Sequence, residues 1–477
     1  GFSEVPCNCT TGTYIAQAMA SGIPSLLFCL LLAAPHLGSS YHTNGGKHFV
    51  VRSSDWRSPS TCSPVPSGDG GRLPVMHRLS PCAPASGAGA GSGQSMPSIS
   101  DALRLRALFG DSGDYKKSGV TIPSIGTPLQ SLPGASEYHV TVGYGTPVQR
   151  LAVGFDTATV GATLLRCEPC AGSRCGKKHL FDPSRSSSLA QIPCGSRNCP
   201  LSDCSGPSCT ATLKKKGAVV LNATFVTDTL TVSRSVAVDD FRFVCLETRG
   251  ASTEGRSSGV LDLSRDPHSL ASRVVLSPDT VAFSYCLPSA FPYSAGFLSF
   301  GATRPNIVSY ATLKSKASHP NLYFLRLVGV SVGAVDIPVP PQALAGDALM
   351  ELHTTFTYLQ PKVYAALRDQ FRGWMGQYPV APPYGELDTC YNFTGQSSVG
   401  VPAVELTFEG GAGLEPGVQQ TMYFKDRGNI FSVGCLAFAP VPPHARGITV
   451  IGSLAQATTE VVYDLRGGKV GFVTKSC

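Results

Sequence analysis

The sequence predicts an all-β protein with two lobes, for three reasons. From Glu137 onward, short alternating or apolar runs recur, rich in β-branched and aromatic residues and separated by Gly and Pro. About 340 residues of such runs exceed one ordinary domain, so we expect two β-rich lobes. The third reason is an internal similarity between the two halves of this region, described below.

The expected strands follow a simple order along the chain, interrupted by one clear helix. Helical spacing of apolar residues and a preceding Pro predict this helix over Lys362–Trp374. The strands are expected at residues 138–142, 151–155, 225–232, 281–285, 297–300, 323–332, 404–408, 448–451, 461–463 and 469–473.

The part of the chain before the lobes has a different composition. Residues 1–40 contain a 12-residue apolar run, 23–34, which is too short to span a bilayer and is typical of a signal peptide. Met19 lies just upstream, and we expect it to be the biological start. Residues 41–136 are rich in Ser, Gly, Pro and Ala, so we expect a flexible, propeptide-like region with one short helix near 99–108. The N-terminal lobe is then expected at 137–305, a linker at 306–319 and the C-terminal lobe at 320–477.

Composition and cysteine count indicate the class of protein. The net charge is +7, but no basic stripe is present, so nucleic-acid binding is not expected. The mature region has an even number of cysteines, which argues for disulfide bonds in a secreted protein, and two sequons, at Asn222 and Asn392, would be glycosylated on that route. A zinc site at Cys167, Cys170 and Cys175 is the alternative, but it lacks a second ligand pair at zinc spacing. The twelve cysteines are Cys167, Cys170, Cys175, Cys194, Cys199, Cys204, Cys209, Cys245, Cys286, Cys390, Cys435 and Cys477.

Two segments of the mature region look like degraded copies of each other. Residues 153–159 and 349–355 each run from an apolar strand into an acid and then a hydroxyl-containing turn. The acids are Asp156 and Glu351, one in each half. Two carboxylates about 3 Å apart share one proton and can activate water for peptide hydrolysis. The alternative is that these are two ordinary surface turns.

The stretch from about residue 74 to the C-terminus resembles the plant nepenthesin-like branch of the pepsin-family aspartic proteases. The resemblance implies a bilobal fold with a central cleft, descent from aspartic endopeptidases, no cofactor or metal, and a monomer that binds a peptide or protein in the cleft. It also implies a secreted protein of the extracellular space (apoplast) or the vacuole, without a membrane span in the mature chain. The matching segments are MHRLSPCAP (76–84), EYHVTVGYGTPVQ (137–149), FDPSRSSSL (181–189), DTLTV (228–232), FSYCLPS (283–289), LDTCYNFTG (387–395), CLAFAP (435–440), VIGS (450–453) and VVYDLRGGKVGF (461–472).

The resemblance also implies a disulfide pairing, which the sequence alone could not choose. The implied bonds are Cys167–Cys170, Cys175–Cys245, Cys194–Cys209, Cys199–Cys204, Cys286–Cys477 and Cys390–Cys435.

The active-site motifs depart from the family pattern at four places. The first Asp-Thr-Gly ends in Ala158, the second Asp-Ser/Thr-Gly reads Glu351-Leu352-His353, the flap Tyr aligns with Lys215, and the Gly behind the first acid reads Asp262. Glu is one methylene longer than Asp, and a displacement of about 1 Å can cost about 100-fold in rate. A cation at His353 or Lys215 would favour ionisation of both acids and remove their shared proton.

We therefore expect proteolysis to be lost or strongly impaired. Two alternatives remain. One is an active endopeptidase that uses Asp156 with Glu351 or Asp262. The other is a protein-binding module for glycoside hydrolases, because cereal xylanase inhibitors share this fold.

Three weaker motifs are expected to be structural. Gly329-Val-Ser331-Val-Gly333 has the pattern of a serine-hydrolase nucleophile but lies in a β-alternating run. His268 and His444 have no second ligand at metal spacing, and Lys214–Lys216 is expected at a solvated hairpin tip.

Overall fold

The protein is described by a computed structural model. Residues 137–477 are described except for 160–161, 169–179, 202–203, 216–217, 234–235, 249–256, 275–281, 290–295, 302–308, 427–428 and 475. Before them, the described segments are 39–43, 46–54, 72–77, 80, 97–110, 121–122 and 127–128. The expected signal segment 23–34 and Met19 lie outside the described residues.

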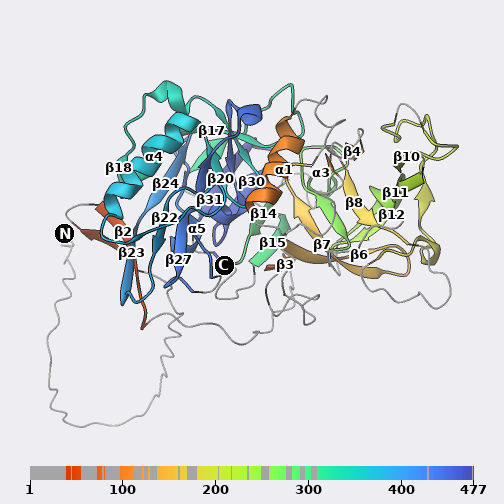
Figure 1. Ribbon diagram of the computed structural model, residues 1–477. Helices are drawn as coiled ribbons and strands as arrows, with labels where there is room; N and C mark the ends of the chain where they lie inside the picture. Colours follow the sequence, from red (N-terminus) through yellow and green to blue (C-terminus); the bar gives the residue numbers. More distant parts are fainter. Residues whose placement is uncertain are drawn as a thin grey trace, which may run out of the picture. The chain divides into compact units, whose positions relative to one another are not determined.

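The N-terminal lobe is formed by the first part of a 14-stranded sheet (Figure 1). Its hairpin β6–β7 brings Tyr144 opposite Gln149. The last four residues of β7 are all buried, as expected for a strand that ends inside the protein. The strands are β6 (Tyr138–Tyr144), β7 (Gln149–Asp156), β8 (Thr163–Arg166), β9 (Ala190–Gln191), β10 (Thr210–Lys215), β11 (Ala218–Thr231), β12 (Ala237–Thr248) and β13 (Gly259–Asp262).

The same sheet continues into strands from both ends of the chain. Its order runs from β6 through β3, β15, β14, β30 and β31 to β16, so that strands near the C-terminus share a sheet with the N-terminal lobe. These strands are β3 (Arg72–His77), β14 (Ala282–Cys286), β15 (Gly296–Gly301), β16 (Tyr310–Thr312), β30 (Glu460–Asp464) and β31 (Lys469–Val473).

The C-terminal lobe contains an eight-stranded sheet and a four-stranded sheet. The larger sheet comprises β17 (Phe324–Val332), β18 (Val335–Asp336), β19 (Asp347–Met350), β20 (Thr357–Leu359), β24 (Val404–Phe408), β25 (Gly413–Leu414), β28 (Phe438–Pro440) and β29 (Ile448–Ile451). The smaller one comprises β21 (Val380–Ala381), β22 (Cys390–Asn392), β26 (Met422–Phe424) and β27 (Val433–Leu436). The mostly-β, bilobal fold class predicted from the sequence is confirmed.

The two predicted helices are present. The main one, α4 (Pro361–Trp374), begins at a Pro and buries Val363, Leu367 and Phe371 at helical spacing. The leader helix α1 spans Pro97–Phe109, slightly longer than expected. Among the described residues, no helix is long and apolar enough to cross a membrane. The short helices are α3 (Leu270–Arg273), α5 (Val418–Thr421), α6 (Ser453–Gln456), η3 (Pro183–Arg185), η4 (Pro341–Leu344) and η5 (Pro443–Ala445).

The described segments of the leader differ from the flexible region that we expected. Strand β2 (Gly46–Arg52) lies between β1 (Ser39–Thr43) and β23 (Ser398–Pro402) of the C-terminal lobe, while β3 lies between β6 and β15. Both leader strands alternate, which buries Phe49 and Val75 in the main core. Composition alone missed this because each strand gains its buried face only from a partner distant in the sequence. A two-residue pair, β4 (Thr121–Ile122) and β5 (Thr127–Pro128), completes the described leader strands.

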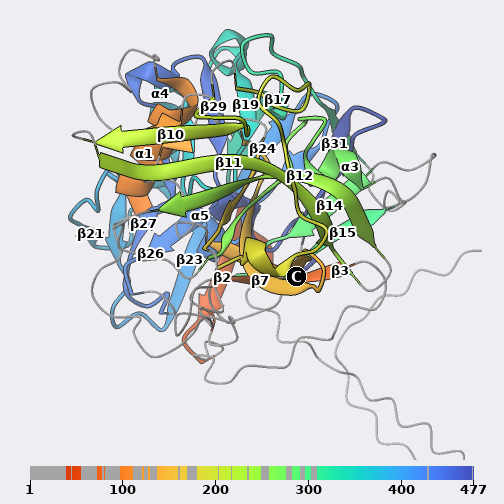
Figure 2. The same ribbon diagram turned by 90° about the vertical axis from the view of Figure 1, so that its right-hand side faces the viewer.

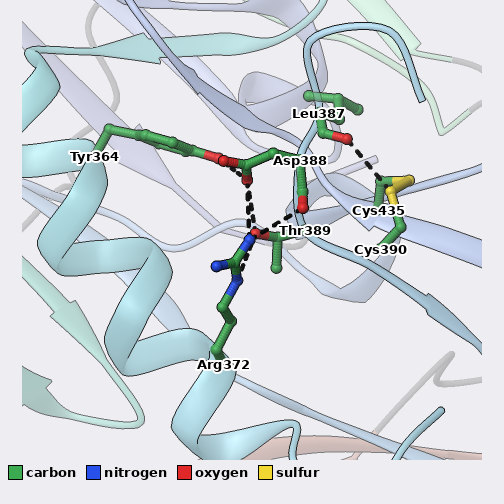
Figure 3. The surroundings of a disulfide bond; sticks show 7 residues. All are labelled: Tyr364, Arg372, Leu387, Asp388, Thr389, Cys390 and Cys435. Atoms are coloured by element: carbon green, nitrogen blue, oxygen red, sulfur yellow. Dashed lines mark hydrogen bonds and ion pairs between the residues drawn. A yellow bond between two sulfur atoms is a disulfide. The ribbon is translucent and has the colours of Figure 1, made fainter. Parts of the chain in front are cut away.

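The disulfide pairing agrees with the expectation in the C-terminal lobe and differs in the N-terminal lobe. Cys286–Cys477 and Cys390–Cys435 are present, the latter joining β22 to β27 next to α4 (Figure 3). The other described bonds are Cys167–Cys245, Cys194–Cys204 and Cys199–Cys209. Cys170 and Cys175 lie outside the described residues.

Local geometry explains why the four bonds expected in the N-terminal lobe are replaced by these three. The backbone N–H of Cys167 donates to Leu246, which places Cys167 beside Cys245 and excludes the expected Cys175–Cys245 and Cys167–Cys170 bonds. The remaining four cysteines lie in one cluster, where Cys199 Sγ is 3.8 Å from Cys204 Sγ although the two are not bonded to each other. Spacing along the chain cannot choose between pairings in such a cluster.

Candidate active site

The two predicted acids occupy equivalent positions in the two lobes. Asp156 ends β7, which runs parallel to β13, and Glu351 directly follows β19, which runs parallel to β29. The register places Asp156 beside Asp262 in one lobe and Met350 beside Ile451 in the other. The internal similarity seen in the sequence therefore reflects a repeated strand arrangement.

The leader helix brings a cation between these acids. Arg104 of α1 donates from Nη2 to Asp156 Oδ2 at 2.7 Å and to Glu351 Oε1 at 2.8 Å. Its Nε donates to the same Glu351 oxygen at 3.0 Å, and Nη2 also contacts the carbonyl of Ala158. All three charged side chains are buried. Since one nitrogen binds both carboxylates, the acids of the two lobes meet at a single guanidinium. In Figure 1, α1 lies between β20 of the C-terminal lobe and β8 of the N-terminal lobe.

The electrostatics favour charged groups at this site. Burial alone would raise the pKa of Asp156, but Arg104, His353 and the N–H of Ala158 together hold it below its ordinary value. His353 Nδ1 lies 3.7 Å from Asp156 Oδ2. Burial would likewise lower the pKa of Arg104, but the two carboxylates keep it above its usual range. In this arrangement the lowered pKa favours the carboxylate form of Asp156.

The contacts of the second acid loop are incomplete. Thr157 Oγ1 donates across to the carbonyl of Met350 at 3.2 Å, whereas Leu352, at the equivalent position, has no hydroxyl with which to return this bond. Glu351 Oε1 also accepts from the N–H of His353, but Glu351 Oε2 is buried without a hydrogen-bond partner among the described groups. The loop is held from behind by Gln456, whose amide donates to the Glu351 carbonyl at 3.0 Å.

The position behind each acid differs between the lobes. In the C-terminal lobe it is Gly452, where an added Cβ would lie 2.1 Å from the carbonyl oxygen of Phe356. In the N-terminal lobe it is Asp262, which is buried and accepts from Thr159 Oγ1 at 2.5 Å and from the N–H of Ser264 at 2.7 Å. Burial raises the pKa of Asp262 to about 6, although these hydrogen bonds lower it.

The described contacts of the Asp262 carboxylate are therefore with its own lobe. Its Oδ2 is buried without a partner among the described groups. The structure brings Asp262 next to Asp156 along the strands, but its hydrogen bonds do not make it a second member of the acid pair.

The flap position lies on a long hairpin of β10 and β11, which runs beside β12 (Figure 2). Lys214 and Lys215 pair with Val219 and Ala218 at the turn end of this hairpin. This places both lysines at the hairpin end, as predicted; Lys216 lies outside the described residues.

Sequence reasoning missed three residues of α1 that hold the leader helix in the site: Arg104, Asp101 and Leu105. Asp101 accepts hydrogen bonds from the backbone N–H groups of Thr355 and Phe356, at 2.8 and 2.9 Å. Leu105, on the same side of α1, packs in a cluster with Ala158 and Phe356. The available signal was an acid and a base one helical turn apart beside a Leu, which is too common a pattern to indicate a docking site.

The weaker motifs lie in ordinary structural settings. Ser331 is inside β17, opposite Glu405 of β24, and not at a strand-to-helix turn. His268 Nδ1 lies 3.1 Å from the carboxylate of Asp266, and His444 belongs to η5. The sulfur atoms of Cys199, Cys204 and Cys209 lie within 4.8 Å of one another, but each of these cysteines is in a disulfide.

Comparisons with known proteins agree with this architecture. Residues 138–302 match the family model "Xylanase inhibitor N-terminal", and residues 322–474 match "Xylanase inhibitor C-terminal". An aspartyl protease family protein of Arabidopsis thaliana is 33% identical over 73% of this chain and 74% of its own length. Aspartic proteinase nepenthesin-2 of Nepenthes gracilis is 28% identical over 74% of this chain and 80% of its own length.

Solved structures support the fold. Conglutin gamma, a basic 7S globulin from lupine seeds, superposes with a TM-score of 0.53 at 18% identity, covering 72% of this chain and 93% of its own. At that identity the likeness concerns the fold alone. The two family models together cover well over half of the chain, and the Arabidopsis relative exceeds 30% identity. The chain therefore belongs to the nepenthesin-like plant branch of the pepsin-type aspartyl protease family, with degenerate motifs at both acids.

Proposed function

We propose that this chain is a secretory-pathway member of the aspartyl protease family in which peptide hydrolysis is lost or strongly impaired. The observation that carries the proposal is the single guanidinium nitrogen of Arg104 that binds both Asp156 and Glu351. A proton-sharing pair needs one acid to be neutral, whereas a cation between two carboxylates favours the charged form of both.

The defect extends beyond the leader helix. Without α1, Glu351 would still be one methylene longer than Asp, and Leu352 would still lack the hydroxyl that connects the two loops. His353, which replaces the family Gly, also lies 3.7 Å from Asp156. Because catalysis requires reacting groups to be held within a fraction of an ångström, these substitutions support a loss of activity that removing Arg104 does not repair.

A second candidate function is protein binding. The family models that match both lobes carry the name of xylanase inhibitors, which supports a role as a binding module for a glycoside hydrolase. The test is a pull-down with purified xylanases, in which no retention at micromolar concentration would argue against this candidate.

The proposal also includes the secretory route. Asn392 is exposed, whereas Asn222 is half-buried and accepts a hydrogen bond from Thr212 Oγ1 at 3.0 Å. We therefore propose Asn392 as the preferred glycosylation site, an extracellular or vacuolar destination, and a monomer.

The activity test compares the full chain with three variants on a denatured protein substrate between pH 3 and 6. We expect the full chain and R104A to show no cleavage above background. We expect R104A combined with E351D, L352S and H353G to show acid activity, because this combination restores both the free carboxylates and the second loop. The fourth protein is D156A, the control for contaminating proteases. Cleavage by the unmodified chain that D156A abolishes would overturn the proposal and leave an active endopeptidase.

A further inference from the structure

A chain of three polar groups connects the leader helix to the C-terminal lobe on the far side of Asp101. The hydroxyl of Tyr358 in β20 contacts Asp101 Oδ2 at 3.2 Å and also contacts Glu386 Oε1. Asp101 and Tyr358 are buried, and Glu386 is half-buried. Arg104 and Asp101 both lie on α1 but bind different partners: Arg104 binds the acid pair, and Asp101 binds the backbone of the C-terminal lobe. The acid pair therefore does not use these groups.

When Asp101 and Glu386 are both ionised, the three groups have too few protons for both contacts of Tyr358 to be hydrogen bonds. A phenol carries one proton and can donate to one oxygen only. Tyr358 contacts two carboxyl oxygens, so one contact would join two acceptors without a hydrogen between them. Both contacts become hydrogen bonds when one carboxyl is protonated and donates to the Tyr358 oxygen.

The geometry assigns this additional proton to Glu386. Asp101 already accepts two backbone N–H groups, one on each oxygen, and this arrangement suits a carboxylate. Glu386 has no comparable donors among the described contacts besides Tyr358. Glu386 therefore donates to Tyr358, and Tyr358 donates to Asp101.

We propose that docking of α1 takes up a proton, held by Glu386 and connected to Asp101 through Tyr358, so that the leader helix is bound more tightly as the pH falls from neutral. The proposal concerns the docking of the helix and does not depend on whether the protein cleaves peptides.

The electrostatics of the same groups agree with this direction. Burial raises the pKa of Glu386, although a hydrogen bond from Tyr358 to the ionised form of Glu386 would lower it. Burial also raises the pKa of Asp101; its backbone hydrogen bonds oppose this shift, while nearby Glu386 and Glu351 add to it. Because Asp101 belongs to α1 and is buried when the helix docks, its raised pKa means that the docked state binds more protons. Its contribution is fully present below the ordinary carboxyl range, near pH 4, and is lost as the pH rises through the raised value.

Other titratable groups also face α1. Arg104 faces Asp156, Glu351 and His353, while His319 contacts the carbonyl of Leu108 and His444 lies on η5, which packs against the helix. The lowered pKa of Asp156 keeps its ion pair intact until the pH falls below the ordinary Asp value, so this pair is constant between pH 5 and 7. Comparing variants with the wild type at the same pH separates the effect of Glu386 on docking from that of these histidines.

The loop that carries Glu386 is held on its other side by α4. Tyr364 donates to Asp388, and Arg372 donates to the carbonyl of Asp388 and to Thr389, as Figure 3 shows. The position of Glu386 is thus fixed independently of α1. Helix α4 also provides an internal reference, because it belongs to the same lobe but has no contact with the proton chain among the described hydrogen bonds.

The test is amide hydrogen exchange of the full chain at pH 5, 6 and 7, corrected for intrinsic rates. We expect protection of α1 to increase relative to α4 as the pH falls, by up to about tenfold per pH unit for one proton. E386Q should be about as protected at pH 7 as the wild type is at pH 5, with a weaker pH dependence than the wild type, because Gln can donate to Tyr358 at any pH.

Two further variants make the assignment specific. D101N should weaken docking at every pH, because its NH₂ group would face a backbone N–H. Y358F should remove the pH dependence, and it provides the test if E386Q does not fold, which exchange of α4 would reveal. Protection of α1 that does not change between pH 7 and 5, or an unchanged pH dependence in E386Q, would overturn the proposal.

Discussion

Asp262 shows how one residue changes the chemistry of a backbone arrangement that is repeated in the two lobes. The N–H of Asp262 donates to Thr163 Oγ1 in the N-terminal lobe, and the N–H of Gly452 donates to Thr357 Oγ1 in the C-terminal lobe. The backbone is thus equivalent, but only the first position carries a carboxylate. One oxygen of this carboxylate is well bonded and the other has no partner among the described groups. A buried acid with one unpaired oxygen and no bound cation is more stable when protonated.

This arrangement predicts that ionisation of Asp262 destabilises the fold. Its folded pKa of about 6 lies above the ordinary value of 3.8. Its favourable contribution is therefore present at low pH and is lost as the pH rises from about 4 through 6, by about 2 kcal/mol between pH 4 and 8. We expect D262N to remove this part of the pH dependence, as measured by denaturant unfolding across that range.

The matched control for this measurement is an acid at an exposed position. Asp336 in β18 is exposed, so D336N should reproduce the wild-type change of unfolding free energy with pH. If D262N and the wild type lose stability in parallel between pH 4 and 8, Asp262 is not the group that titrates.

At the scale of elements, the leader is tied to the body at three separate places. β2 adds a strand to β23 of the C-terminal lobe, β3 lies inside the sheet that joins the lobes, and α1 binds at the acid pair. Val75 of β3 is fully buried, and Lys47 of β2 forms an ion pair of 2.6 Å with Glu415. Strands held by backbone ladders and a buried face stay associated without a covalent connection when their partners remain folded.

We therefore predict that cutting the chain within 86–95 does not release the preceding fragment. A site-specific protease sequence placed in this Gly/Ser/Ala stretch separates β1–β3 from the rest, and the fragment should co-elute with the body in gel filtration. V75D should release it, because a charge would enter the core, whereas R52D at the exposed end of β2 should not. A fragment that dissociates from the unmodified protein after cutting would show that the leader strands are held only by chain connectivity.

The elements also show how far sequence reasoning reaches. Helix α4 and the helical part of the leader were predictable because their apolar spacing is local. The docking of α1 was not, since Arg104 and Glu351 are 247 residues apart and no local pattern links them. The acids themselves were found because the two lobes repeat the same strand arrangement. The pairing predicted for the four cysteines at residues 194–209 was wrong for a related reason, because four neighbouring sulfurs allow more than one pairing.

At the scale of the whole molecule, the C-terminal segment returns to the sheet that contains strands from the middle of the chain. β14 lies between β15 and β30, and the last residue, Cys477, is bonded to Cys286 at the end of β14. Backbone hydrogen bonds from Thr458 to Leu287 and from Ser476 to Thr458 hold the C-terminal segment against the same strand. The C-terminal lobe therefore lies within a closed covalent loop whose junction is the sheet between the lobes.

This closed loop leads to a prediction for stability. The Cys286–Cys477 bond spans 191 residues, and constraint of the unfolded chain over such a loop is worth about 5 kcal/mol in the chain-entropy description. The C286S/C477S variant should lose about that much unfolding free energy, as measured by denaturant titration. The control is C390S/C435S, whose bond spans 45 residues and joins two strands that remain paired, with an expected loss of about 4 kcal/mol. A loss below about 1 kcal/mol for C286S/C477S would mean that the backbone hydrogen bonds and the sheet, and not the disulfide, hold the C-terminus in place.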